Sequence, residues 1–139
     1  MASSNLDLVR SIYADWGRRE FGSMEWAHPE IEYVRADGPD PGRWMGLIGV
    51  AEAARPRLSA WEDFRTEAEE YRELDDERVL VLIRATGRAK TSGLELGQIG
   101  SKGAVLFHLR GGKVTRLVSY MDRENALADL GLAPEGGTP

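Results

Sequence analysis

The chain has 139 residues, of which 42% are hydrophobic, and 18 basic against 23 acidic side chains leave a formal net charge of −5. This length fits one domain with its own core, and the absence of cysteine excludes disulfides and cysteine-ligated zinc. The acidic balance argues against nucleic-acid binding, and neither a signal peptide nor a membrane span is recognisable, so we expect a soluble, cytoplasmic protein.

Apolar residues at helical spacing predict a first helix near the N-terminus. Ser4 or Asn5 can cap this helix, and Asp7 lies in its first turn, where the helix dipole favours a negative charge. The apolar face consists of Leu6, Val9, Ile12, Tyr13 and Trp16. We therefore expect an amphipathic helix with an aromatic end.

A short second helix and a strand are expected next. Ser23 is the predicted cap of a helix that carries Trp26 and ends before Pro29. Residues 31–36 alternate as a strand, so every second side chain points to the same face. One face carries Ile31, Tyr33 and Arg35.

The segment Asp37–Gly46 contains two prolines and three glycines, which predicts a loop without regular structure. A third helix is predicted from Gly49 to Trp61. Pro56 lies inside this helix, and we expect it to cause a kink because proline cannot donate the helical hydrogen bond.

The second half of the sequence predicts strands at 64–74, 79–89, 94–109 and 114–121. The run VLVLI at 79–83 indicates a strand that is covered on both faces. Gly97, Gly100 and Gly103 suggest bends or bulges in the long strand, and Gly111-Gly112 predicts a tight hairpin.

A final helix is predicted from Arg123 to Leu130, with Gly131 as its C-cap and Leu132 as the hydrophobic contact that follows. Residues 133–139 are expected to be a disordered tail, so the domain covers residues 1–132. Helices followed by a run of antiparallel strands indicate an α+β fold with helices on one face of a curved sheet.

Five stretches resemble, in the same order, the SnoaL-like branch of the NTF2-like superfamily. They are VRSIYADWGRREF, HPEIEYV, GLIGVAEAARPRLSAWEDF, VLVLIRATGRAKTSGLEL and FHLRGGKVTRLVSYMDRENALADLGL. The resemblance implies a cone-shaped α+β half-barrel, in which N-terminal helices pack on a strongly curved, mainly antiparallel sheet. It also implies a deep apolar pocket and a homodimer formed through the sheet. It is specific for the fold and not for the function, because this superfamily hosts several enzyme classes and non-catalytic adaptors.

Two catalytic sets of the superfamily do not match. The positions that resemble those used by ketosteroid isomerases fall near Ile12, Tyr33 and Val105. This set does not offer the needed chemistry, which is a base to abstract a proton together with donors to hold the resulting oxyanion. Relatives of limonene-epoxide hydrolase need an arginine between two aspartates. The strand at 79–89 has Arg84 and Arg88 but no acid, so epoxide hydrolysis is disfavoured unless an acid comes from elsewhere in the fold.

Asp122 stands where SnoaL-type polyketide cyclases, by resemblance, use an aspartate as general acid/base. This role requires burial beside Tyr120 and a raised pKa. Asp122 also directly precedes the helix that begins at Arg123, where an N-cap needs no pocket. Both readings stay open.

His108 can be a pocket wall or a residue on the sheet face. A two-residue turn at Gly111-Gly112 would place it opposite Thr115, facing away from Asp122. A three-residue turn with a bulge would bring His108 and Asp122 to one face. Their separation along the ladder, roughly 20 Å, argues against a direct dyad in either case.

No metal or phosphate site is predicted. The chain has only two histidines, His28 and His108, which lack the spacing of familiar metal sites. No glycine-rich phosphate-binding motif occurs, and we expect neither a metal nor another cofactor.

The aromatic residues as a set are candidates to line a cavity for a flat apolar ligand, although core packing is the better explanation of any single ring. Trp44, in the predicted loop, is the candidate lid. The predicted substrate-binding residues are Tyr13, Trp16, Trp26, Tyr33, Trp44, Trp61, Phe107, His108 and Tyr120.

The leading hypothesis is a pocket for a hydrophobic small molecule. It could support an acid/base cyclisation or isomerisation of a polyketide-like substrate, with Asp122 carrying the proton. The alternative is a non-catalytic ligand-binding or dimerisation module of the same fold. The expected partners are the small molecule and a second copy of the chain.

Overall fold

The computed structural model describes residues 2–17, 25–37, 41–89 and 102–132. Its helices are α1 (Ala2–Gly17), α2 (Gly46–Ala60) and α3 (Arg123–Leu130). Its strands are β1 (Ala27–Arg35), β2 (Gly42–Met45), β3 (Trp61–Asp75), β4 (Arg78–Ala89), β5 (Lys102–Arg110) and β6 (Lys113–Tyr120). No helix in the described ranges is long and apolar enough to cross a membrane.

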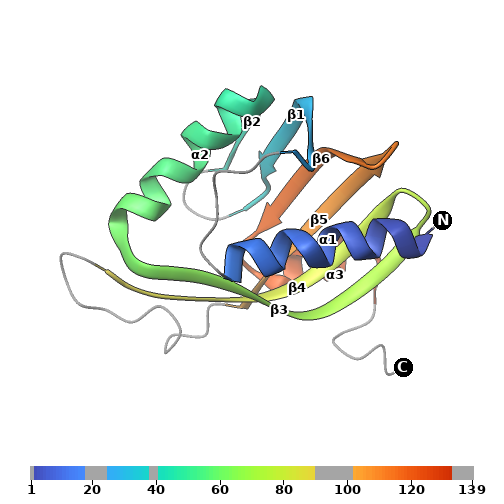
Figure 1. The fold of residues 1–139 in the computed structure, drawn as a ribbon. Coiled ribbons are helices and arrows are strands. Elements are labelled where there is room, and N and C mark those ends of the chain that lie inside the picture. The colour runs from blue at the N-terminus through green and yellow to red at the C-terminus, as the bar shows by residue number, and fades with distance from the viewer. Residues whose placement is uncertain (1, 18–24, 38–40, 90–101, 133–139) are drawn as a thin grey trace.

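The strands form one curved sheet in the order β2–β1–β6–β5–β4–β3 (Figure 1). β1 and β6 pair in parallel, and the other described neighbours pair antiparallel. We call the face covered by α1 and α2 the inner face and the face covered by α3 the outer face. The predicted α+β class, with helices on a mainly antiparallel sheet, is confirmed.

The core has two layers that share β4. Val79 and Val81 point to the inner face, where they pack in a cluster with Val9 of α1. Leu80 and Leu82 point to the outer face, where α3 covers them. All of these side chains are buried, so the prediction that the aliphatic run has cover on both faces is confirmed.

The turns at the C-terminal end follow their sequence signals. Gly111 and Gly112 have φ values of 60° and 78°, and Arg110 pairs with Lys113 across this two-residue turn. Gly131 ends α3 in the left-handed conformation, and the Leu132 N–H donates to the Leu127 carbonyl at 2.9 Å. The predicted hairpin and the predicted C-cap are both confirmed.

The region before α2 differs from the prediction. Residues 42–45 form the edge strand β2 instead of a loop, because their backbone pairs with β1 from Gly42 opposite Arg35 to Met45 opposite Glu32. The prolines and glycines mark where the chain turns, but a partner strand decides whether the next residues are extended.

β1 begins earlier than predicted. Trp26 lies in a turn and not in a helix, while the predicted cap Ser23 is outside the described residues. The strand starts at Ala27 and includes Pro29, which lies where the β1–β6 register shifts between Ala27 and Glu32. At such an irregularity a residue without an N–H donor is tolerated.

The helix predicted at 49–61 spans Gly46–Ala60 instead, and Trp61 already belongs to β3. Within the predicted strand 94–109, residues 94–101 lie outside the described residues, including Gly97 and Gly100. Gly103 serves a close approach of two backbones. A Cβ at this position would lie 2.5 Å from the Tyr120 carbonyl oxygen.

Candidate functional site

Aromatic side chains from α1, β3 and β5 meet on the inner face. Tyr13 of α1 lies edge-on to Phe107 of β5, with ring centroids 5.9 Å apart. It also lies edge-on to Tyr71 of β3, at 6.3 Å. Such edge-to-face pairs are favourable beyond the area that they bury. Tyr13 is therefore the centre of an aromatic contact that joins the first helix to two strands.

A second aromatic pair lies where β1 meets β2. Tyr33 stands directly opposite Trp44 in the register, and their ring centroids are 5.7 Å apart. Tyr33 is buried and Trp44 is half-buried against the inner cluster. Because Trp44 belongs to an edge strand, the premise that it lies on a loop is corrected. It stacks beside Tyr33 from a paired strand.

Arg35 lies beside this pair. It follows Tyr33 by two positions on β1 and so points to the same face. Its guanidinium carbon is 4.8 Å from the centroid of the Trp44 ring and 5.9 Å from that of Tyr33. At these distances the cation is attracted to the electron-rich ring faces.

Two tyrosines of the inner face, Tyr13 and Tyr71, have raised pKa values. Burial, followed by the nearby Tyr71 and Tyr33, raises the pKa of Tyr13 well above its usual value. Burial also raises the pKa of Tyr71, although the charge of Arg10 acts in the opposite direction. A protonated phenol donates a hydrogen bond, so this face offers O–H donors rather than bases.

The structure thus brings together five of the predicted substrate-binding residues in one inner cluster: Tyr13, Trp26, Tyr33, Trp44 and Phe107. Trp16 and Trp61 belong to α1 and β3, but their side chains lie outside the described residues. His108 and Tyr120 do not join the cluster, because both point to the outer face.

Tyr120 is tied to α3. Its hydroxyl donates to the Asp129 carboxylate at 3.2 Å, and its ring packs in the outer cluster. Burial and Asp129 raise its pKa. Tyr120 therefore anchors the last helix to the sheet, and a contact with substrate stays a prediction.

His108 lies on the outer face because β5 alternates regularly, with Leu106 on the outer face and Phe107 and Leu109 on the inner face. The two-residue turn alone would place His108 opposite Thr115, but the register shifts between His108 and Leu109, so that His108 pairs with Arg116. The extra residue in β6 changes the face of the β6 residues that follow it, and it brings Tyr120 to the same face as His108.

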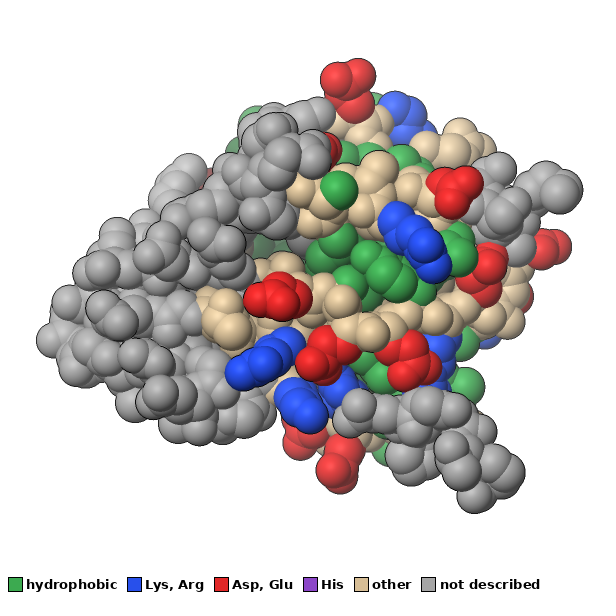
Figure 2. Space-filling model, turned by 60° about the horizontal axis from the view of Figure 1, so that its bottom comes forward, with side chains coloured by type: hydrophobic (Ala, Val, Ile, Leu, Met, Phe, Trp, Pro, Cys, Tyr) green, Lys and Arg blue, Asp and Glu red, His purple; other side chains and the backbone are tan. Residues whose placement is uncertain are grey.

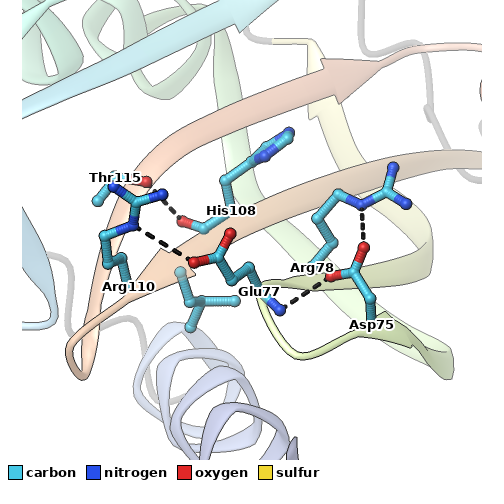
Figure 3. Close-up of a pocket in the computed structure, with 7 residues that line it drawn as sticks. Asp75, Glu77, Arg78, His108, Arg110 and Thr115 are labelled. Atoms are coloured by element: carbon cyan, nitrogen blue, oxygen red, sulfur yellow. Dashed lines mark hydrogen bonds and ion pairs between the residues drawn. The ribbon is translucent and has the colours of Figure 1, made fainter.

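His108 lines a polar pocket of about 330 Å³, which lies beside the turns that join β3 to β4 and β5 to β6 (Figure 3). Its wall includes the ion pairs Arg78–Asp75, at 2.8 Å, and Arg110–Glu77, at 3.3 Å. Burial, then the charges of Arg116 and Arg78, lower the pKa of His108. The pocket is charged and lies on the opposite face of the sheet from the aromatic cluster. A role of His108 in substrate binding stays a prediction.

Asp122 is the N-cap of α3. Its carboxylate accepts a hydrogen bond from the Glu124 N–H at 2.9 Å, and the residue is exposed. The arrangement required of a proton carrier, burial beside Tyr120 inside a pocket, is absent at this residue. The geometry is that of a helix cap.

Of the two arginines in the epoxide-hydrolase comparison, Arg84 does not face the aromatic cluster, and the side chain of Arg88 lies outside the described residues. Arg84 is exposed, and it follows Leu80 and Leu82 at alternate positions, so it shares their outer face. The backbone register places Glu67 of β3 opposite Arg84, so the neighbouring strand offers an acid that β4 itself lacks. In the described part of the chain, no group of three His, Asp or Glu side chains is placed to hold a metal ion.

Sequence reasoning missed two members of the inner site, Arg35 and Tyr71. The signal for Arg35 was its alternation with Tyr33, which placed it on the same face but assigned it no role. Tyr71 lies among acidic residues, so its strand looked polar throughout. The β3–β4 register places Tyr71 opposite the buried Val81.

On the surface, apolar and charged side chains are segregated. In Figure 2 hydrophobic side chains gather in the middle of one face, and acidic and basic side chains surround them. The guanidinium carbon of Arg10 lies 5.2 Å from the centroid of the Tyr71 ring, so a cation covers one side of this aromatic ring.

No protein-family model matches the chain, and no curated protein matches it. Solved structures do match. An NTF2-like protein of unknown function from Burkholderia pseudomallei K96243 has a TM-score of 0.73 at 20% identity, covering 90% of this chain and 95% of that chain. TerC co-crystallized with polyporic acid has a TM-score of 0.72 at 22% identity, with coverages of 91% and 97%.

A putative SnoaL-like polyketide cyclase from Jannaschia sp. CCS1 has a TM-score of 0.70 at 14% identity, covering 95% of this chain and 94% of that chain. At such identities the likeness establishes the fold alone. At the level of fold, the resemblance to NTF2-like and SnoaL-like proteins is confirmed.

Proposed function

Since the chain has the NTF2-like fold, we propose that the inner face of its sheet binds a planar, mainly apolar small molecule. The observation that carries the proposal is the stack of Tyr33, Trp44 and Arg35 at the β1–β2 edge. Tyr33 is buried, but Trp44 is only partly covered, and a partly covered flat ring is a natural contact for a flat ligand.

The position of Trp44 supports this role. Tyr33 fixes one side of the indole, and Gly42 leaves room for it, because a Cβ at Gly42 would lie 3.0 Å from the ring. Trp44 is nevertheless only half-buried. A rigid aromatic surface that remains partly open loses little conformational entropy when a ligand stacks on it.

The neighbours of the same fold support a ligand-binding reading. TerC was co-crystallized with polyporic acid, and other neighbours are described as putative polyketide cyclases. We propose binding without an assigned reaction, since Asp122 caps a helix on the opposite side of the sheet from this stack. An acid/base cyclisation or isomerisation therefore needs a proton carrier other than Asp122 in its present position.

Binding can be tested with N-phenyl-1-naphthylamine, a neutral aromatic probe whose fluorescence rises in apolar surroundings. We expect saturable binding, and we expect Trp44→Ala to weaken it about tenfold because a stacking surface is lost. Met45→Ala is the matched control, since Met45 is the next residue of β2 and is 60% exposed. Absence of saturable binding, or equal losses in the two variants, would contradict the proposal.

We propose a second copy of the chain as the protein partner, docked through the part of the outer face that α3 leaves open. There Glu32 of β1 lies between Arg43 of β2, at 2.7 Å, and Arg116 of β6, at 3.5 Å. Alternating charges on one face can meet their complements on a two-fold related copy. Sedimentation equilibrium tests this, with a dimer that weakens in Glu32→Arg as the expected result. A monomer at all concentrations would refute it.

A further inference from the structure

The guanidinium of Arg35 has fewer hydrogen-bond acceptors than it has N–H donors to satisfy. Its Nη2 donates to the Ala53 carbonyl oxygen of α2 at 3.1 Å. Its Nε is buried and has no hydrogen-bond partner, and in the described part of the chain no carboxylate forms an ion pair with it. A buried donor without an acceptor is costly, so such a group gains when an acceptor arrives.

Three other arginines, two in the sheet and one at the start of α3, differ in this respect. Arg43, Arg78 and Arg123 form ion pairs with carboxylates at 2.7, 2.8 and 2.6 Å, respectively. The chain is acidic, with 23 acidic against 18 basic side chains, so carboxylates are plentiful. In the described part of the chain, Arg35 has one backbone acceptor, whereas these three arginines each have a carboxylate partner.

The surroundings of Arg35 hold its guanidinium in place. Trp44 contacts one side of it, Tyr33 lies beside it on the same strand, and the Ala53 carbonyl fixes one end. A guanidinium stacked on aromatic rings presents its N–H groups in a plane, which suits a carboxylate or another oxyanion.

We propose that the ligand of this site is a planar acid, and that Arg35 receives its anionic group. The acidic group is a carboxylate, or an ionised phenol or enol, whose oxygen accepts from the Arg35 guanidinium while the ring lies against Trp44. This inference rests on the proposed function and adds to it the chemical class of the ligand. Arg35 is then the residue that makes the site bind acidic ligands more tightly than neutral ligands of the same shape.

The test uses two probes of equal shape, 2-naphthoate and its neutral amide 2-naphthamide, with dissociation constants measured by calorimetry on the intact protein. We expect the wild-type chain to bind naphthoate about tenfold more tightly than the amide. Arg35→Met keeps an unbranched apolar side chain and removes the charge, so it should abolish this preference. Arg35→Gln provides a second variant, which retains a donor for the Ala53 carbonyl.

Arg43→Met is the matched control, because Arg43 lies on the neighbouring strand but pairs with Glu32 on the outer face. It should keep the preference for naphthoate. Equal affinities of the wild type for the two probes, or a preference that survives in both Arg35 variants, would overturn the inference while leaving the proposed function intact. Failure of both probes to bind would overturn the proposed function, and this inference with it.

Discussion

Asp37 and Asp122 form a linked pair at the junction of β6 and α3. The Asp37 carboxylate accepts from the N–H groups of Met121, at 2.6 Å, and of Asp122, at 3.2 Å, and from Asn125 Nδ2 at 2.8 Å. Asp122 in turn accepts from the Glu124 N–H. Asp37, which follows β1 by two residues, thereby fixes the backbone at Met121 and Asp122, where the last helix is capped.

This arrangement predicts that Asp37 matters more for stability than the cap residue itself. Asp122→Ala should lower the free energy of unfolding by about 1 kcal/mol, the usual effect of losing a cap. Asp37→Ala should lower it by about 2 kcal/mol, because three donors lose a charged acceptor. Asp122→Asn retains a capping oxygen and should be close to wild type. Urea unfolding measures all three, and a larger loss in Asp122→Ala than in Asp37→Ala would contradict this reading.

A second prediction concerns Arg123, which is 4% exposed although it is charged. Its guanidinium donates to Glu69 Oε1 at 2.6 Å, the Ile83 carbonyl at 2.8 Å and the Gly103 carbonyl at 3.4 Å, so it joins α3 to three strands. Arg123→Met should cost about 3 kcal/mol, because buried acceptors lose their donor.

Arg110→Met is the control for Arg123, since Arg110 is 77% exposed and pairs with Glu77 at 3.3 Å on the surface. This variant should change stability by at most about 0.5 kcal/mol. Comparable losses in the two variants would show that burial of Arg123 is not what makes it important. Chemical denaturation gives both values.

A third prediction concerns Gly103. Adding a methyl group should lower stability by about 2 kcal/mol, because the Tyr120 carbonyl lies 2.5 Å from the new Cβ and is held by the β5–β6 pairing. Gly111→Asn is the control: nothing lies within 4 Å of its Cβ, and asparagine tolerates the positive φ. Thermal unfolding should separate the two variants clearly, and a Gly103→Ala protein as stable as Gly111→Asn would disprove the close approach.

The fourth prediction is a dependence of stability on pH through His108. Its pKa is lowered in the folded chain by burial and by Arg116 and Arg78. Just below pH 6.5, the ordinary value for histidine, the unfolded chain therefore binds more protons, and stability falls as the pH falls. His108→Gln should remove this part of the slope.

An NMR titration of the His108 ring should give a midpoint below about 6.5. In Arg116→Met the midpoint should rise, because one of the two lowering charges is gone. A midpoint at or above the ordinary histidine value in the wild type would be incompatible with the structure.

Elements whose signals are local could be predicted from the sequence. The aliphatic run of β4, the Gly111-Gly112 turn and the capped helix α3 all follow from short patterns in neighbouring residues. β2 could not be predicted in this way, because its four residues become a strand only through pairing with β1. Local composition indicates where the chain turns, but it does not indicate which distant strand a segment will pair with.

The same limit applies to the site. Whether Tyr120 shares a face with His108 depended on one bulge in β6, which no local pattern marks. The sequence grouped the aromatic residues as candidates for one apolar site, but whether Trp44 meets Tyr33 or Tyr120 joins Asp129 depends on the register. Arg35 is a candidate ligand-binding residue only because of its surroundings, which are two aromatic rings and one backbone carbonyl.

The parallel contact between β1 and β6 bears on how the chain is made. Tyr33 of β1 pairs with Leu117 of β6, so β1 is synthesised well before the strand with which it pairs. Until β6 leaves the ribosome, β1 and β2 lack the strand that connects them to β5, β4 and β3 in the finished sheet. The two parts join only when the central strand arrives between them, at the entropic cost of closing a long loop. A nascent chain that stalls before Lys113 therefore exposes both halves of its unfinished sheet.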